Sequence, residues 1–192
     1  MILATMETAF LLITGLARDI QALEMNPLGP LNGKNLGTNV SPWVITPDAL
    51  QQYRTESIPR QPDVKTTTLL ADSGKEALNI QLSVKISSPE QKSPKTACIS
   101  NSAYMYWTLE QCLVQQALAG AGLRTGDLVA TGTVSGEKEE EHGCLMEFMK
   151  EGANPPRGYL EDHETVLLEG YCGEGVGFGE CIGTLLPAKP VE

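Results

Sequence analysis

The sequence predicts a mixed, β-rich α+β domain: a mixed β-roll or sandwich with a few short helices. Its 192 residues, 41% of them hydrophobic and 20% charged, fit one soluble globular domain with a core of its own. Strand patterns separated by closely spaced turns dominate the second half of the chain, which is typical of a roll or sandwich. The sequence contains no internal repeat and no clear linker, so we expect one folding unit.

Two short helices and one strand are expected in the first half. A helix over residues 19–25 should end before Pro27, because the residue that precedes a proline avoids the helical region. A second helix over 46–50 should begin with Thr46 as its N-cap and Pro47 in its first turn. The other expected segments are a glycine- and proline-rich loop over 27–38, a strand over 41–45 and a polar surface connection over 51–75.

A long strand and the strongest helix open the second half. Apolar and polar residues alternate over 78–87, which is the pattern of a half-buried strand. Apolar residues at helical spacing predict a helix over 101–119, which Gly120 and Gly122 should end. Further strands are expected over 128–135, 144–150, 165–171 and 176–186, with a loop over 88–95 and a turn at 125–127.

Charge, cysteines and the first residues limit the class of protein. The net charge of −10 argues against nucleic acid or an anionic membrane as a partner, because both repel an acidic surface. Five dispersed cysteines with no C-x-x-C pair favour free thiols in a reducing compartment. Residues 1–13 are apolar, but they contain Glu7 and are fewer than the ~20 residues that span a bilayer. They also lack the basic start of a signal peptide, so we expect a buried strand or helix there.

Polar residues of the first predicted helix and of the following loop are candidate site residues. Arg18, Gln21 and Met25 are spaced so that they share one helix face. Lys34 lies in the loop, where glycines let the backbone approach a ligand closely. A solvated helix face explains the pattern as well as a binding site does, because such side chains are mostly exposed in proteins.

Two further candidates lie in predicted strands. Glu147 is one carboxylate in an apolar segment, and a buried lone charge must be paired or neutralised. An edge strand that lets Glu147 reach solvent is the alternative. Thr133 lies on the polar face of the strand predicted over 128–135 and could line a pocket, although an exposed polar face gives the same pattern.

Nucleotide-binding and metal-binding motifs are not evident. The alternate glycines over 173–179 do not match G-x-G-x-x-G and no helix follows them. The acidic run 137–141 before His142 is most simply a solvated loop, and His163 lies in a turn pattern. Neither histidine has the spacing of a metal-ligand motif.

An ordered set of short segments resembles the C-terminal part of the fumarylacetoacetase family, within the broader fumarylacetoacetate hydrolase fold. The match covers nearly everything from Ala17 to Ala188, and the order of the segments is more specific than any one of them. The segments are Ala-Arg-Asp-Ile-Gln at 17–21, Pro-Leu-Gly-Pro at 27–30, Gly-Lys-Asn at 33–35, Gly-Thr at 37–38, Ser-Pro-Trp-Val at 41–44, Tyr-Met-Tyr-Trp-Thr at 104–108, Leu-Arg-Thr-Gly-Asp-Leu at 123–128, Gly-Thr-Val-Ser-Gly at 132–136 and Val-Gly-Phe-Gly-Glu-Cys at 176–181.

The resemblance implies an enzyme that hydrolyses the carbon–carbon bond of 4-fumarylacetoacetate to fumarate and acetoacetate in tyrosine and phenylalanine catabolism. It implies a cytoplasmic homodimer with Ca²⁺ in the active site and Mg²⁺ nearby. In the family, a histidine held by a glutamate deprotonates water, which attacks a carbonyl group of the β-diketone. By position, Arg18, Gln21 and Lys34 match the donors to the resulting alkoxide, and Glu147 matches the partner of the base. Gln21 and Thr133 match substrate contacts, whereas Lys34 and Thr38 match the surroundings of Mg²⁺.

Departures from the family pattern are equally specific. Thr14 occupies the position of an aspartate that ligates Ca²⁺, and Met25 that of a substrate-contacting tyrosine. The family's catalytic histidine and three other carboxylate ligands lie upstream of the matched region and have no counterpart in this sequence. We therefore expect residues 1–16 to be a divergent segment, residues 17–192 to be an incomplete family domain, and the chain as written to have little or no hydrolase activity.

Two alternatives keep the fold and change the function. One is a dimerising pseudoenzyme or binding protein that has lost the chemistry. The other is an enzyme with a different substrate, such as an acylpyruvate hydrolase. The Tyr-Met-Tyr-Trp-Thr and Ser-Pro-Trp-Val segments favour fumarylacetoacetase over these smaller relatives.

Overall fold

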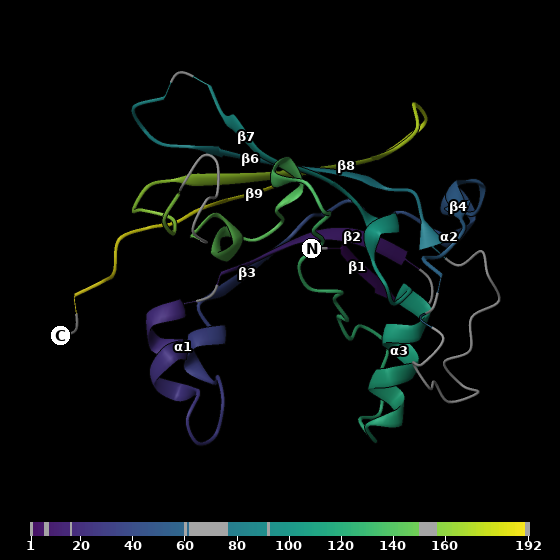
Figure 1. Cartoon of the computed structure of the whole chain (residues 1–192), viewed down its shortest axis with the longest axis horizontal. Helices are drawn as coiled ribbons and strands as arrows, with labels where there is room; N and C mark the ends of the chain where they lie inside the picture. Colours follow the sequence, from purple (N-terminus) through teal and green to yellow (C-terminus); the bar gives the residue numbers. More distant parts are fainter. Residues whose placement is uncertain are drawn as a thin grey trace.

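A four-stranded antiparallel sheet forms the main layer of the protein. The computed structural model describes residues 2–5, 8–15, 17–59, 61, 77–91, 93–149 and 157–190. The strand order of the main sheet is β7-β6-β8-β9, and Figure 1 shows it along the top of the view. Its strands are β6 (Gln81–Ser87), β7 (Lys95–Asn101), β8 (Thr165–Cys172) and β9 (Val176–Thr184).

A second antiparallel sheet lies against β8 and β9. It contains β1 (Ile2–Thr5), β2 (Thr8–Gly15) and β3 (Gly37–Val40), in that order. The Asn39 side-chain amide donates a hydrogen bond to the carbonyl of Ile182 at 3.0 Å, and the Ser41 hydroxyl donates to the carbonyl of Phe178 at 3.3 Å. These contacts join the end of β3 to β9. A small third sheet pairs β4 (Arg54–Thr55) with β5 (Ala77–Leu78).

Helices are short and lie outside the sheets. In Figure 1, α1 (Arg18–Glu24) and α3 (Leu109–Leu118) both lie below the sheets, whereas α2 (Pro47–Leu50) lies at one end. Single 3₁₀ turns punctuate the connections: η1 (Asn32–Lys34), η2 (Gln51–Tyr53), η4 (Ser102–Tyr104), η5 (Glu139–Glu141) and η6 (Leu145–Met149). No helix among the described residues has the length and apolar content to cross a membrane.

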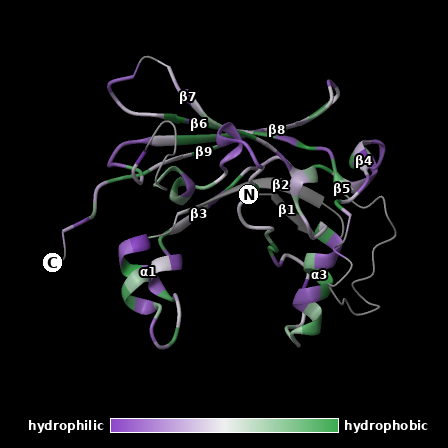
Figure 2. Ribbon diagram, viewed as in Figure 1, coloured by the Kyte–Doolittle hydropathy of each residue, from purple (hydrophilic) through white to green (hydrophobic). Residues whose placement is uncertain are grey.

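The hydrophobic core is built mainly from the main sheet. Ile80, Cys172 and Phe178 are fully buried, and Leu82 and Ile86 are buried from alternate positions of β6. Figure 2 shows hydrophobic residues along β6 and β8. Alternation therefore directs one face of β6 into the core, as the sequence pattern indicates.

Several predictions are confirmed. The fold is a β-rich α+β fold, and the first helix ends at Glu24, before Pro27. The strand predicted over 78–87 forms as β5 and β6, and the last two predicted strands form as β8 and β9. The five cysteines are free thiols, and the described residues 2–5 and 8–15 form the strands β1 and β2. Of the connection predicted over 51–75, residues 60 and 62–75 lie outside the described residues.

Two predicted strands are wrong because local turns replace them. Residues 144–150 were expected to be extended, but η6 forms, and the Glu147 backbone N–H donates to the carbonyl of Cys144 at 3.0 Å. The segment 128–135 contains a single bridge at Ala130, and Gly132 has a φ of 81°, which interrupts an extended run.

Two further boundaries differ from prediction. The helix expected over 101–119 begins only at Leu109, because Thr108 and Gln111 form a reciprocal capping box; the residues before it belong to β7 and η4. The strand expected over 41–45 is a turn in which the Trp43 N–H donates to the Ser41 hydroxyl at 3.2 Å. The paired strand lies just before it, as β3.

Candidate functional site

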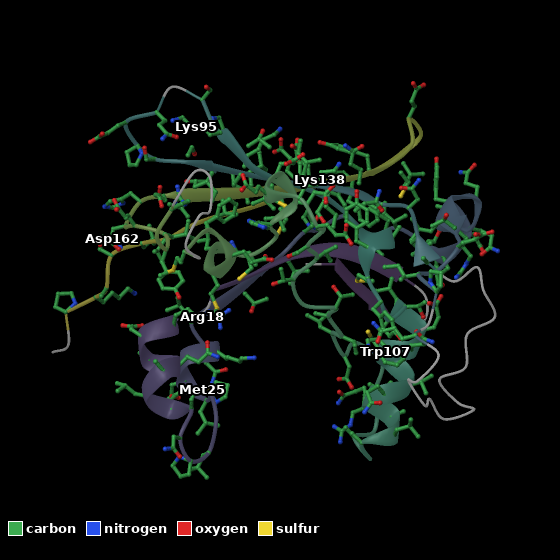
Figure 3. The ribbon with its side chains drawn as sticks, viewed as in Figure 1. Arg18, Met25, Lys95, Trp107, Lys138 and Asp162 are labelled. Carbon is green, nitrogen blue, oxygen red and sulfur yellow. The ribbon has the colours of Figure 1, made fainter. Side chains whose placement is uncertain are left out.

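The first candidate residues lie on α1. The Arg18 guanidinium donates a hydrogen bond to the Gln21 side-chain oxygen at 2.6 Å, as their spacing of three residues on a helix allows. Both side chains are half-buried. Figure 3 shows Arg18 at the end of α1 nearest the sheets and Met25, the C-cap residue, further from them. The sequence pattern correctly places Arg18 and Gln21 on one helix face.

The loop that follows α1 folds back along the helix. The Ala17 N–H donates to the carbonyl of Gly33 at 2.8 Å. Gly33 is buried, and a Cβ atom at this position would lie 2.7 Å from the backbone nitrogen of Gln21 and 3.0 Å from the carbonyl oxygen of Ala17. A glycine is therefore required for η1 to lie this close to α1. Lys34, the last residue of η1, is consequently held beside the helix that carries Arg18 and Gln21.

Glu24 fixes the same loop from the other end of α1. Its carboxylate accepts backbone N–H groups from Leu31 at 2.7 Å, Asn32 at 2.8 Å and Gly33 at 3.0 Å. The N–H group of Leu31, followed by that of Gly33, lowers the pKa of this carboxyl. Glu24 was not predicted from the sequence, because its partners lie seven to nine residues further along the chain.

The predicted metal-region residues lie on the second sheet and the loop. Thr14 on β2 pairs in register with Thr38 on β3, so the two positions are cross-strand neighbours. Lys34 and Thr38 are exposed. Two threonines and a lysine make a poor donor set for Ca²⁺ or Mg²⁺, which prefer carboxylate and carbonyl oxygens. By themselves, these residues do not provide a suitable set of ligands for a divalent cation.

Glu147 lies in a separate turn. The Ser135 hydroxyl donates to one of its carboxylate oxygens at 2.8 Å, and the Cys144 N–H donates to the same oxygen at 3.1 Å. Ser135 in turn accepts the Gly143 N–H at 3.1 Å. The carboxylate is half-buried and held by hydrogen bonds, although in a 3₁₀ turn rather than in the predicted strand. Thr133 is exposed, and its methyl group lies close to Gly143.

Glu141, between the two hydrogen-bond partners of Glu147 in the chain, has a buried carboxylate. Glu141 was expected in a solvated loop, but it is buried and accepts hydrogen bonds from the Tyr104 hydroxyl at 3.1 Å and the Lys138 N–H at 3.2 Å. The Lys138 N–H lowers the pKa of Glu141, and the bond to Glu141 raises the pKa of Tyr104. The acidic run 137–141 gave no sequence signal for this turn, because the decisive partner, Tyr104, lies 37 residues away in the chain.

The two histidines make other contacts. The His142 ring packs edge-on against Phe148, with ring centroids 5.6 Å apart. His163 is exposed in a turn with a φ of 69°, and its backbone N–H donates to the carbonyl of Leu185 at 2.7 Å. Within the described part of the chain, neither histidine is hydrogen-bonded to Glu147, and no group of three or more histidine, cysteine, aspartate or glutamate residues is placed to hold a metal ion.

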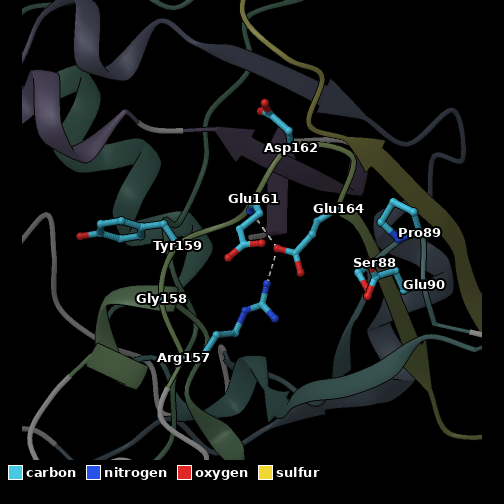
Figure 4. A pocket seen from close by; sticks show the side chains of 9 residues that line it. All are labelled: Ser88, Pro89, Glu90, Arg157, Gly158, Tyr159, Glu161, Asp162 and Glu164. Atoms are coloured by element: carbon cyan, nitrogen blue, oxygen red, sulfur yellow. Dashed lines mark hydrogen bonds and ion pairs between the residues drawn. The ribbon is translucent and has the colours of Figure 1, made fainter.

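The structure brings the candidate residues together as two groups. Arg18, Gln21 and Lys34 belong to the α1–η1 unit, whereas Thr133 and Glu147 belong to the 133–147 segment. In the ranges that the structure describes, no hydrogen bond or ion pair joins the two groups. A cavity of about 410 Å³ lies elsewhere and is lined by none of them. Figure 4 shows it, with the Glu164 carboxylate accepting from Arg157 at 2.5 Å and from the Glu161 N–H at 2.9 Å.

The fold is a β-rich α+β fold in which α1 carries the hydrogen-bonded pair Arg18 and Gln21, and the adjoining turn η1 carries Lys34. Residues 8–185 match the family model described as fumarylacetoacetate (FAA) hydrolase C-terminal, and the chain belongs to this family. The matched range begins within the segment 1–16; a division of the chain at residue 17 stays a prediction.

Fumarylacetoacetases of several organisms are similar to this chain. Identity is 40% over 184 residues with that of Dictyostelium discoideum, covering 90% of this chain and 43% of the relative. It is 43% over 183 residues with that of Oryza sativa subsp. japonica, covering 91% and 42%, and 41% over 182 residues with that of Homo sapiens, covering 90% and 43%. The chain thus spans less than half the length of the curated relatives it matches.

Proposed function

We propose that this chain supplies part of the active site of a fumarylacetoacetase-type hydrolase, which cleaves the carbon–carbon bond of 4-fumarylacetoacetate to give fumarate and acetoacetate. The observation that carries the proposal is the α1–η1 unit, in which Arg18 and Gln21 are hydrogen-bonded and Lys34 is held alongside. Membership of the family and identities of 40–43% to fumarylacetoacetases support it.

Arg18 and Lys34 of the α1–η1 unit carry N–H donors that could bind an alkoxide oxygen. When water adds to a carbonyl carbon, negative charge develops on the carbonyl oxygen, and fixed donors that meet this charge lower the barrier. The Arg18 guanidinium carries five N–H donors, one of which is engaged by Gln21. Lys34 has an exposed ammonium group. In the proposed reaction, Arg18 and Lys34 stabilise the alkoxide and Gln21 orients Arg18 and the substrate.

The proton-transfer part of the reaction depends on Glu147. A glutamate that orients a base must present a fixed carboxylate, and Ser135 and the Cys144 N–H hold that of Glu147. Among the described residues, the His142 ring packs on Phe148 and neither histidine is hydrogen-bonded to Glu147, so we propose that the 192 residues alone hydrolyse the substrate slowly or not at all. A homodimer and a cytoplasmic location belong to the same proposal. Ca²⁺ and Mg²⁺ are the cofactors that the family resemblance implies, but Thr14, Lys34 and Thr38 are a poor set of ligands for them, so we do not expect this chain alone to hold Ca²⁺.

The test measures binding and turnover of 4-fumarylacetoacetate by the purified chain. Turnover is measured as the loss of β-diketone absorbance with and without Ca²⁺. Binding is measured by calorimetry on the same protein. We expect binding that Arg18→Ala weakens by about tenfold or more, since a charge-assisted hydrogen bond is lost. Arg124→Ala removes the same charge from a distant loop and should leave binding unchanged.

The two parts of the proposal fail separately. Turnover as fast as that of a full-length relative would refute the claim that the base is not supplied by this chain. Equal binding by the Arg18→Ala and Arg124→Ala proteins would refute the assignment of the α1–η1 unit as the donor site.

A further inference from the structure

The α1 helix has few interactions of its own. It is seven residues long, its N-cap Ala17 provides no side-chain cap, and none of its residues is buried. Helices of fewer than about 12 residues are marginal in water even when their sequence favours them. The geometry of Arg18 and Gln21 therefore depends on what α1 packs against, which is the loop that ends in η1.

Glu24 provides the densest set of contacts between that loop and the helix. One carboxylate oxygen accepts the N–H groups of Leu31 and Gly33, and the other accepts that of Asn32. Side chains on a helix lean toward its N-terminus, so a residue in the last turn can reach a loop that runs back along the helix. Three consecutive backbone donors therefore converge on one side chain, immediately before Lys34.

Gly33 transmits this arrangement to the start of the helix. Its N–H is bound by Glu24, while its carbonyl accepts the Ala17 N–H at 2.8 Å. The absence of a side chain at Gly33 lets the loop lie against the backbone of Gln21. If the loop moved away from Glu24, the hydrogen bond between the Ala17 N–H and the Gly33 carbonyl, next to Arg18, would therefore be strained or lost.

We infer that Glu24 is a positioning residue for the proposed hydrolase site: it holds the loop 31–33 on α1 and so sets Lys34 beside Arg18 and Gln21. The inference rests on the proposed function for the meaning of that arrangement. Glu24 acts through the loop rather than on a substrate, because both of its carboxylate oxygens are engaged by backbone N–H groups. The lowered pKa of its carboxyl agrees with three donors that favour the charged form.

The experiment compares three variants of the full chain by amide hydrogen exchange. In Glu24→Ala, exchange at Leu31, Asn32 and Gly33 should accelerate by about tenfold or more, the factor expected when a charge-assisted hydrogen bond is lost. The Ala17 amide should accelerate with them, because its acceptor is Gly33. In Glu24→Gln, the remaining amide oxygen should preserve part of the protection. Asp19→Asn is the matched control, since it removes a negative charge from the same helix at a residue that does not bind the loop.

Two outcomes decide the inference. Acceleration at the loop and at Ala17 in Glu24→Ala, partly rescued in Glu24→Gln and absent in Asp19→Asn, supports it. Unchanged protection at Ala17 in Glu24→Ala, or equal acceleration in Asp19→Asn, overturns it. The exchange readout needs neither turnover nor substrate, so substrate binding that is equal in the Arg18→Ala and Arg124→Ala proteins counts against the proposed function alone. If the chain does turn over, Glu24→Ala should lower kcat more than it raises KM, because a misplaced Lys34 affects the alkoxide more than the bound substrate.

Discussion

Replacement of Gly33 by alanine tests how closely the loop packs on α1. The added Cβ would lie 2.7 Å from the Gln21 nitrogen, 2.9 Å from the Gln21 Cα and 3.0 Å from the Ala17 oxygen. All three are backbone atoms, which cannot rotate away as the end of a side chain can. Overpacking of this kind typically costs about 1–3 kcal/mol, so the free energy of unfolding should fall by that amount.

Gly37→Ala is the matched control. A Cβ added at Gly37 would have no neighbouring atom within 4 Å, and Gly37 has no left-handed φ, so its replacement should change stability by less than about 0.5 kcal/mol. Urea unfolding followed by circular dichroism measures both variants, and amide exchange at Ala17 reports whether the loop has moved. If Gly33→Ala is as stable as Gly37→Ala and keeps its Ala17 protection, the close packing of η1 on α1 is wrong.

Three further predictions concern other parts of the molecule. Ser135→Ala removes the donor 2.8 Å from Glu147 and should lower the free energy of unfolding in urea by about 1–3 kcal/mol; an unchanged value would contradict the described turn. Lys85 lowers the pKa of Glu169, so the stabilisation from this pair is complete above the pKa of an unfolded glutamate, about 4.3, and is lost as pH falls through the lower folded value. Glu169→Gln should therefore flatten the loss of stability below about pH 4, and an identical acid profile would count against the pair. Burial raises the pKa of the Cys98 thiol to about 11, so at pH 8 about one thiol in a thousand is ionised, and iodoacetamide should label Cys98 only after unfolding, as mass spectrometry can check.

Local signals predicted the parts of the fold that local forces determine. The proline after Asn26 correctly indicated the end of α1, and the alternation of residues 78–87 correctly indicated a half-buried strand. The capping box of Thr108 and Gln111 was also visible in the sequence, and it would have moved the start of α3 to Leu109.

The 144–150 segment shows why a short apolar run is ambiguous. Its periodicity does not separate a strand from a turn or helix. The decisive contacts are the hydrogen bonds of the Glu147 carboxylate to Ser135 and to the Cys144 N–H, and the first of these joins residues twelve apart. The prediction that the Glu147 carboxylate is paired is confirmed, whereas its backbone conformation depends on a partner that the local pattern does not reveal.

The candidate residues could be named from the sequence, whereas the contacts that arrange them could not. Family resemblance pointed to Arg18, Gln21 and Lys34, and helix spacing predicted that the first two lie on one face. Glu24 could not be found this way, because a carboxylate in a short helix is usually solvated and its three donors belong to a loop whose path has no regular pattern. The contact that holds the site together is therefore a property of the folded loop.

The most direct test of the central claim is a titration of the isotopically labelled chain with 4-fumarylacetoacetate, monitored by nuclear magnetic resonance. We expect the signals of the Arg18 guanidinium, the Gln21 side-chain amide and the Lys34 backbone amide to shift together while the substrate remains largely intact. Shifts confined to other parts of the chain, with these three signals unchanged, would contradict the assignment of the α1–η1 unit as the site where the substrate binds.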